Sequence, residues 1–133
     1  MSNEASVPQG NTGDILNWPM LKLAYRTDAE KIAALLPPGI EPGAEPIVRL
    51  TIYNFPVPDE PEYGVVTAVD ANFNGVAGEY TLGYGIDQES AIFVSQETNG
   101  QPKYPCITEY FRLGPSVTAR CTHHGYTFVE YKG

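Results

Sequence analysis

The sequence is poor in cysteine and in positive charge, and it contains no long apolar run. Its two cysteines, Cys106 and Cys121, are too few for a disulfide framework, which predicts two free thiols in or near a core. Eight Lys and Arg stand against 16 Asp and Glu, a formal net charge of −8, and this balance argues against a nucleic-acid partner. No apolar run approaches the ~18 residues of a membrane span, so we expect no membrane partner. The adjacent His123 and His124 predict no metal site, because neighbouring strand residues point to opposite faces.

The start of the chain lacks the basic and apolar segments of a secretory signal, so a cytoplasmic location is the default expectation. Residues 1–14 are rich in Ser, Asn, Gly and Pro and predict a flexible arm. The 133 residues are 42% hydrophobic and only 18% charged, a composition typical of a packed globular chain. We therefore expect a single domain over residues 15–133.

Short strands separated by Gly and Pro dominate the domain. One helix is expected: a capping box with Thr27 as N-cap and Glu30 three residues later opens it, and Pro37 ends it. Alternation over 79–86 predicts one common face for Tyr80, Leu82, Tyr84 and Ile86. Strands are predicted from Trp18 to Tyr25 and over 47–53, 65–72, 79–86, 91–96, 107–113, 117–122 and 126–131. The predicted fold class is mostly β (α+β), a curled antiparallel sheet or partial β-barrel with one short N-terminal helix.

Lysine is scarce, and Lys103 differs from the other lysines in its context. Lys22, Lys31 and Lys132 fit solvated surface positions, whereas Pro102 and Pro105 bracket Lys103 directly after a predicted strand. A lysine held rigidly at the mouth of a β-structure can lose its solvation and react as a nucleophilic amine. From local context alone, an ordinary turn lysine is the simpler interpretation.

Three motifs change that interpretation. They are Leu-Pro-Pro-Gly-Ile-Glu-Pro at 36–42, Phe-Asn-Gly-Val-Ala-Gly-Glu-Tyr at 73–80, and Glu-x-x-Gly-x-Pro-Lys at 97–103. In this order and spacing the chain resembles acetoacetate decarboxylase and its superfamily. The resemblance implies the family's curled-sheet fold and a Schiff base between Lys103 and a small 2- or 3-oxo acid. It also implies neither metal nor organic cofactor, because the iminium itself serves as the electron sink.

The same resemblance assigns further site residues. Glu97 matches a family glutamate near the lysine, and Glu62 is the nearest candidate for the active-site glutamate, so both are predicted to be catalytic. Tyr104 stands where the decarboxylase has a second lysine, and Trp18 stands where it has an arginine. These departures favour the divergent branch, in which the Schiff base is kept and oxo acids undergo aldol condensation, dehydration or hydration.

Several aromatic and arginine side chains have two interpretations. Tyr80, Tyr84 and Phe93 are core residues or, from alternate strand faces, line a pocket. Arg26 and Arg49 are surface charges or partners of a substrate carboxylate. The candidate substrate-binding residues are therefore Tyr104, Trp18, Tyr80, Tyr84, Phe93 and Arg26.

The first hypothesis is thus a Schiff-base-forming lyase. It either decarboxylates a small oxo acid or catalyses the aldol condensation and dehydration of that acid. The alternative is a non-catalytic small-molecule-binding domain that retains the family pocket, and a third is a structural subunit with an open sheet edge. Members of the family run longer than 133 residues. We therefore expect a domain incomplete at its C-terminus, completed in a homo-oligomer or by a second chain.

Overall fold

The computed structural model describes residues 19–55 and 61–133. The predicted arm over 1–14 and Trp18 lie outside the described residues. In chain order the elements are β1 (Met20–Arg26), α1 (Ala29–Leu35), β2 (Glu41–Pro42), β3 (Ile47–Phe55), β4 (Glu62–Phe73), β5 (Val76–Ile86), α2 (Glu89–Asn99), β6 (Lys103–Pro105), β7 (Ile107–Leu113), β8 (Ser116–His123) and β9 (Tyr126–Lys132).

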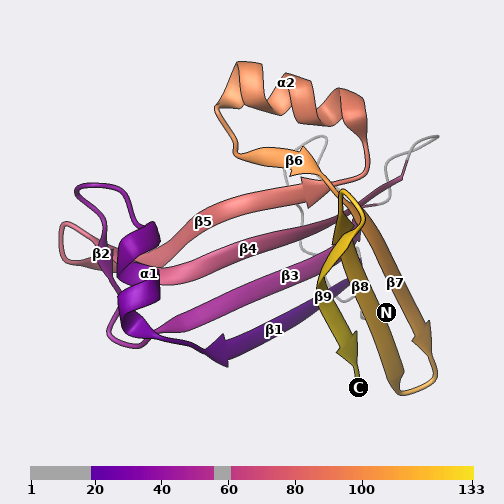
Figure 1. Cartoon of the computed structure of the whole chain (residues 1–133), viewed down its shortest axis with the longest axis horizontal. Coiled ribbons are helices and arrows are strands. Elements are labelled where there is room, and N and C mark those ends of the chain that lie inside the picture. The colour runs from indigo at the N-terminus through magenta and orange to yellow at the C-terminus, as the bar shows by residue number, and fades with distance from the viewer. Residues whose placement is uncertain (1–18, 56–60) are drawn as a thin grey trace, which may run out of the picture.

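Two open sheets form the described part of the chain. The main sheet has the order β1-β3-β4-β5-β6, with β2 paired to β4, and the second sheet has the order β7-β8-β9. Neighbouring strands are antiparallel except for β5 and β6, which run parallel. Figure 1 shows the second sheet crossing one end of the main sheet, with α2 beyond the β6 edge. The prediction of a mostly β, curled sheet is confirmed.

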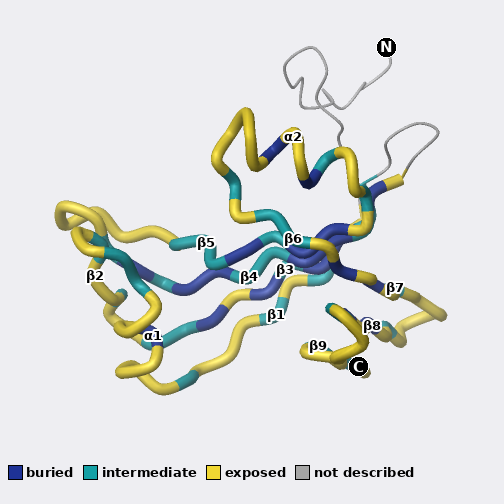
Figure 2. The backbone as a smooth tube through the Cα atoms, turned by 45° about the horizontal axis from the view of Figure 1, so that its top comes forward, coloured by how far each residue is buried: buried dark blue, intermediate teal, exposed yellow. Residues whose placement is uncertain are grey.

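The core lies on one face of the main sheet. Val48, Leu50 and Ile52 are buried there and alternate with Arg49 and Thr51, as their spacing predicts. Helix α1 and the second sheet cover this face, and the buried Cys106 and Cys121 belong to the same cluster. Figure 2 shows the buried stretches along β3 and β4 and toward the end of β5. Both cysteines are free and buried, so that prediction is confirmed.

The expected strand over 91–96 is wrong, because this segment lies inside helix α2. Ile92 and Ser95, three residues apart, are buried, while Phe93 and Val94 between them are exposed. A short apolar run fits a strand and a buried helix equally well, and here tertiary contacts select the helix. Gly100 ends the helix in the left-handed region at φ 61°, where its N–H bonds to the carbonyl of Gln96. Residues 19–55 and 61–133 therefore contain two helices rather than the one expected.

The predicted common face of strand 79–86 is also wrong. Thr67 and Ala68 are adjacent on β4 but pair with Gly83 and Thr81 on β5, which leaves Leu82 as the extra residue of a β-bulge. A one-residue bulge exchanges the two faces of a strand. Tyr80 and Leu82 consequently contact the core, whereas Ile86 joins a second cluster on the opposite face and Tyr84 lines a cavity there.

Helix α1 begins one residue later than predicted. Its N-cap is Asp28, whose side chain accepts a hydrogen bond from the Glu30 N–H at 2.9 Å, so Thr27 as N-cap is wrong. The Thr27 N–H donates to the Pro46 carbonyl at 2.8 Å and so continues the β1–β3 pairing by one residue. Over the described residues, neither helix is long and apolar enough to cross a membrane.

Candidate active site

A cavity of about 370 Å³ opens on the face of the main sheet opposite the core. Its floor is a single row that crosses every long strand of the sheet. Lys22 pairs with Thr51, Thr51 with Val66, Val66 with Tyr84, and Tyr84 with Lys103. All five residues line the cavity, so the sheet register brings Lys103 together with residues up to 81 positions away in the chain.

The backbone around Lys103 is held from both sides. On the sheet side, the Tyr84 N–H donates to the Pro102 carbonyl at 3.0 Å. On the helix side, Nε2 of Gln96 donates to the Lys103 carbonyl at 2.6 Å. The Lys103 side chain is half-buried and enters the cavity from the edge strand β6. Strand pairing and a helix thus fix the base of this lysine, as the flanking prolines suggested.

Glu62 lies close enough to Lys103 for the two charges to interact. Its carboxyl is buried, with 8% relative exposure, and accepts a hydrogen bond from the Tyr53 hydroxyl at 3.5 Å. Burial raises the pKa of Glu62, and the positive charge of Lys103 opposes that rise. Burial, followed by the Glu62 charge, also raises the pKa of Tyr53. The Tyr53–Glu62 pair thus lies beside the lysine, with Tyr53 lining the cavity and Glu62 behind it.

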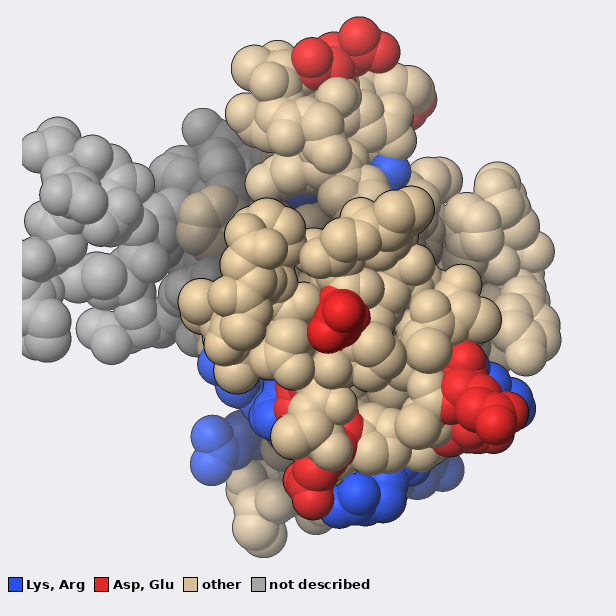
Figure 3. All heavy atoms as spheres, turned by 90° about the vertical axis from the view of Figure 1, so that its left-hand side faces the viewer, with Lys and Arg blue, Asp and Glu red and all other residues tan. Residues whose placement is uncertain are grey.

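Arg49 lines the same cavity but is already paired. Its Nε and a terminal nitrogen donate to the two carboxylate oxygens of Asp70 at 2.6 and 3.0 Å, and Glu79 lies 3.8 Å from Nε. The hydrogen bond from Arg49 lowers the pKa of Asp70. Figure 3 shows acidic and basic side chains side by side on this end of the molecule. Arg49 thus lies at the wall of the cavity with its charge already paired to Asp70.

The structure brings only some of the predicted site residues to this cavity. Lys103 and Tyr84 line it, and Glu62 lies behind Tyr53. Glu97 is exposed on α2, next to the residue that bonds to Lys103. Arg26 pairs with Glu45 at 3.0 Å, at the end of β1 remote from the cavity-lining Met20.

The remaining candidates lie elsewhere. Tyr104 follows Lys103 directly and therefore points to the opposite face, where it packs in the core against Gly83 and Gly85. Tyr80 is on that face as well. Trp18 is outside the described residues.

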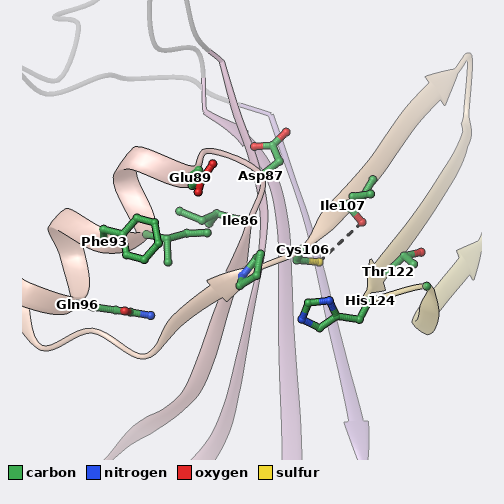
Figure 4. Close-up of a pocket in the computed structure, with 12 residues that line it drawn as sticks. Ile86, Asp87, Glu89, Phe93, Gln96, Cys106, Ile107, Thr122 and His124 are labelled. Carbon is green, nitrogen blue, oxygen red and sulfur yellow. Dashed lines mark hydrogen bonds between the residues drawn. The ribbon is translucent and has the colours of Figure 1, made fainter.

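Phe93 lines a second cavity, of about 540 Å³, between α2 and the β8–β9 turn. Figure 4 shows Phe93 and Gln96 on the helix side of this space, with Cys106 and His124 on the other. A hydrogen bond with Cys121 lowers the pKa of Cys106 and raises that of Cys121. Neither Lys103 nor Glu62 lines this second cavity.

Sequence reasoning missed several residues of the first cavity, among them Lys22, Thr51 and Tyr53. Lys22 was interpreted as a solvated charge, and Thr51 and Tyr53 were given no role, yet all three line the cavity. A signal was present for two of them: the alternation over 47–53 separates Arg49, Thr51 and Tyr53 from the core positions. Lys22 became informative only once its pairing with Thr51 was known.

The family model described as acetoacetate decarboxylase matches residues 2–133. The chain belongs to the acetoacetate decarboxylase family. Among curated relatives, the acetoacetate decarboxylase of Paraburkholderia phytofirmans is 36% identical over 92 residues, which are 66% of this chain and 35% of that protein. The chain thus spans about a third of the length of that relative.

Two solved structures share the fold. Acetoacetate decarboxylase from Legionella pneumophila superposes with a TM-score of 0.71 at 21% identity, covering 94% of this chain and 54% of that one. The enduracididine biosynthesis enzyme MppR, complexed with pyruvate, superposes with a TM-score of 0.67 at 19% identity, covering 95% and 62%. Both solved structures thus share the fold of the chain that carries Lys103 here.

Proposed function

We propose that the protein is a Schiff-base-forming lyase acting on a small 2- or 3-oxo acid, with Lys103 as the nucleophile. The observation that carries the proposal is that the lysine of the family's Pro-Lys motif lines a cavity beside a buried carboxyl. The relatives add the substrate class, since one is named for acetoacetate and the MppR structure contains pyruvate.

The reaction begins when the neutral amine of Lys103 attacks the ketone carbon of the substrate. The carbinolamine loses water, and the C=N bond of the iminium replaces the C=O bond. From a 3-oxo acid, the carboxylate then leaves as CO₂ and its bond electrons form an enamine. From a 2-oxo acid, an α-proton leaves instead and the enamine adds to an aldehyde. Protonation and hydrolysis release the product and regenerate the amine.

We assign the proton transfers of these steps to Glu62 and Tyr53. A buried carboxyl with a raised pKa holds its proton more readily than an exposed one, so Glu62 can protonate the departing hydroxyl of the carbinolamine. Tyr53 can relay that proton, because its hydroxyl bonds to Glu62 and the residue lines the cavity. Glu97, exposed on α2, remains a proposed catalytic partner that has to approach Lys103 in the substrate complex.

Borohydride trapping tests the proposal directly. The full chain is incubated with acetoacetate or with pyruvate, reduced, digested and mapped by mass spectrometry. We expect one reduced adduct on Lys103, lost in Lys103→Ala and retained in Lys31→Ala, the matched control at an exposed position of α1. Absence of an adduct with either acid contradicts the proposal. Release of CO₂ then separates decarboxylation from aldol chemistry.

The alternative is a non-catalytic domain that binds a small molecule in the same cavity. Tyr104 favours it, because this residue has no positive charge and stands where the family decarboxylase has a second lysine. Ligand binding without a trapped adduct or turnover would establish this alternative.

A further inference from the structure

The cavity has a lysine at each end of its floor. Lys22 on β1 and Lys103 on β6 belong to the same row, with Thr51, Val66 and Tyr84 between them. Four interstrand spacings of about 4.8 Å separate the two backbones, roughly 19 Å on a flat sheet. The curl of the sheet shortens this span, and both side chains line the space between its ends.

The three cations of the cavity differ in what they already bind. Arg49 is held by Asp70 and Glu79, and Lys103 is the proposed nucleophile. Within residues 19–55 and 61–133, Lys22 has neither a hydrogen-bond nor an ion-pair partner for its ammonium group. Lys22 can therefore take an incoming anion without the loss of an existing ion pair.

The surface between the two lysines suits a short carbon chain. Val66 and Ala68 offer apolar side chains in the middle of the floor, and Thr51 places a polar side chain beside Lys22. A three- or four-carbon monoacid bound to Lys103 leaves the Lys22 end of the cavity empty. A longer acid with a carboxylate remote from its ketone fills both ends.

We propose that Lys22 binds a second, distal carboxylate of the substrate, so that the substrate class is an oxo dicarboxylic acid. This inference rests on the proposed function of Lys103. Lys22 is a specificity-determining residue: it selects the diacid and takes no part in bond making at the ketone. The aliphatic spacer of the substrate crosses Val66, and its ketone lies at Lys103.

The test compares matched acids that differ only in the second carboxylate. Borohydride trapping at Lys103 is measured against concentration for 2-oxoadipate and for 2-oxohexanoate, at low ionic strength. Wild type, Lys22→Met, Lys22→Arg and Lys31→Met are compared. Lys22→Met keeps the side-chain length without the charge, and Lys31→Met removes one charge outside the cavity.

We expect Lys22→Met to raise the half-saturating concentration of 2-oxoadipate about tenfold, because the variant loses one charge-assisted hydrogen bond to the distal carboxylate. The value for 2-oxohexanoate stays within about twofold, as expected for a screened surface charge. Lys22→Arg retains the preference for the diacid, and Lys31→Met changes neither value. The proposal is overturned if Lys22→Met affects both acids equally, affects neither, or is matched by Lys31→Met.

A second measurement separates this proposal from the function of Lys103. Calorimetric binding of 2-oxoadipate is measured to Lys103→Met and to the double variant Lys22→Met/Lys103→Met. Weaker binding to the double variant supports the carboxylate role of Lys22 even where no adduct forms, in which case only the Schiff-base function fails. Equal binding to both variants overturns the role of Lys22, whatever the trapping experiment shows.

Discussion

The ring of Tyr53 lies directly across Gly64 on the neighbouring strand. A Cβ atom built on Gly64 would stand 2.6 Å from Cζ and from the hydroxyl of Tyr53, and 2.8 Å from the Gly85 carbonyl oxygen. Only a residue without a side chain lets the Tyr53 hydroxyl reach Glu62. The geometry of the candidate acid–base pair therefore depends on a glycine that carries no functional group.

Gly64→Ala is expected to displace the Tyr53 ring and to lower the free energy of unfolding by about 1–3 kcal/mol, the usual range for overpacking. Urea unfolding measures the loss. Gly78→Ala is the matched control, because a Cβ at Gly78 meets no atom within 4 Å on the same sheet. Equal stability of the two variants would show that the strands yield to the added methyl group.

The stability of the protein is expected to depend on the protonation of Glu62. Burial raises its folded-state pKa above the ordinary value of 4.5, so the folded state binds this proton more tightly than the unfolded state does. The free energy of unfolding should therefore fall as the pH rises from 4.5 through the folded-state pKa. Glu62→Gln, which mimics the protonated form, should remove this fall.

Urea unfolding of both proteins across the acid-to-neutral range checks this expectation. Glu41→Gln, at an exposed position on β2, is the control and should leave the pH dependence as in wild type. Parallel pH profiles for wild type and Glu62→Gln would mean that another group causes the dependence.

Gln96 is predicted to be a positioning residue for Lys103. Loss of its hydrogen bond to the Lys103 carbonyl in Gln96→Ala should slow iminium trapping at saturating oxo acid about tenfold, because a small displacement of a nucleophile is costly. The half-saturating concentration should stay unchanged. Gln96→Glu, which lacks the donor, should behave as Gln96→Ala does, whereas Thr98→Ala on the exposed side of α2 should match wild type. A change in the half-saturating concentration alone would assign Gln96 to binding instead.

Gly100 is expected to determine where α2 ends. Its φ of 61° disfavours residues with a Cβ, so Gly100→Ala should lower the free energy of unfolding by about 1 kcal/mol. Gly100→Asn should lower it less, because asparagine tolerates the left-handed region. Thermal unfolding of the three proteins measures the order, and an alanine variant as stable as wild type contradicts the assignment.

Most strands could be predicted because one face of each is buried and a period of two is visible in their residues. The segment 47–53 shows this well: its buried and open positions in β3 are those that its alternation predicts. Helix α2 could not be predicted, because its apolar run is short and its Ile92 is buried in a cluster with Tyr53, which is distant in the sequence. The bulge at Leu82 could not be predicted either, because it is a shift in the pairing register between β4 and β5 and not a property of one segment.

By itself, the sequence determined the family, the mostly β fold class and the lysine to which the chemistry is assigned, because motifs and alternation are local properties of the chain. Only the tertiary structure decided which side chains accompany Lys103. Strand register aligned Lys22, Thr51, Val66 and Tyr84 with it, and a single bulge moved Tyr84 to its face. Register depends on pairing between distant segments, and a shift of one residue exchanges the two faces of a strand.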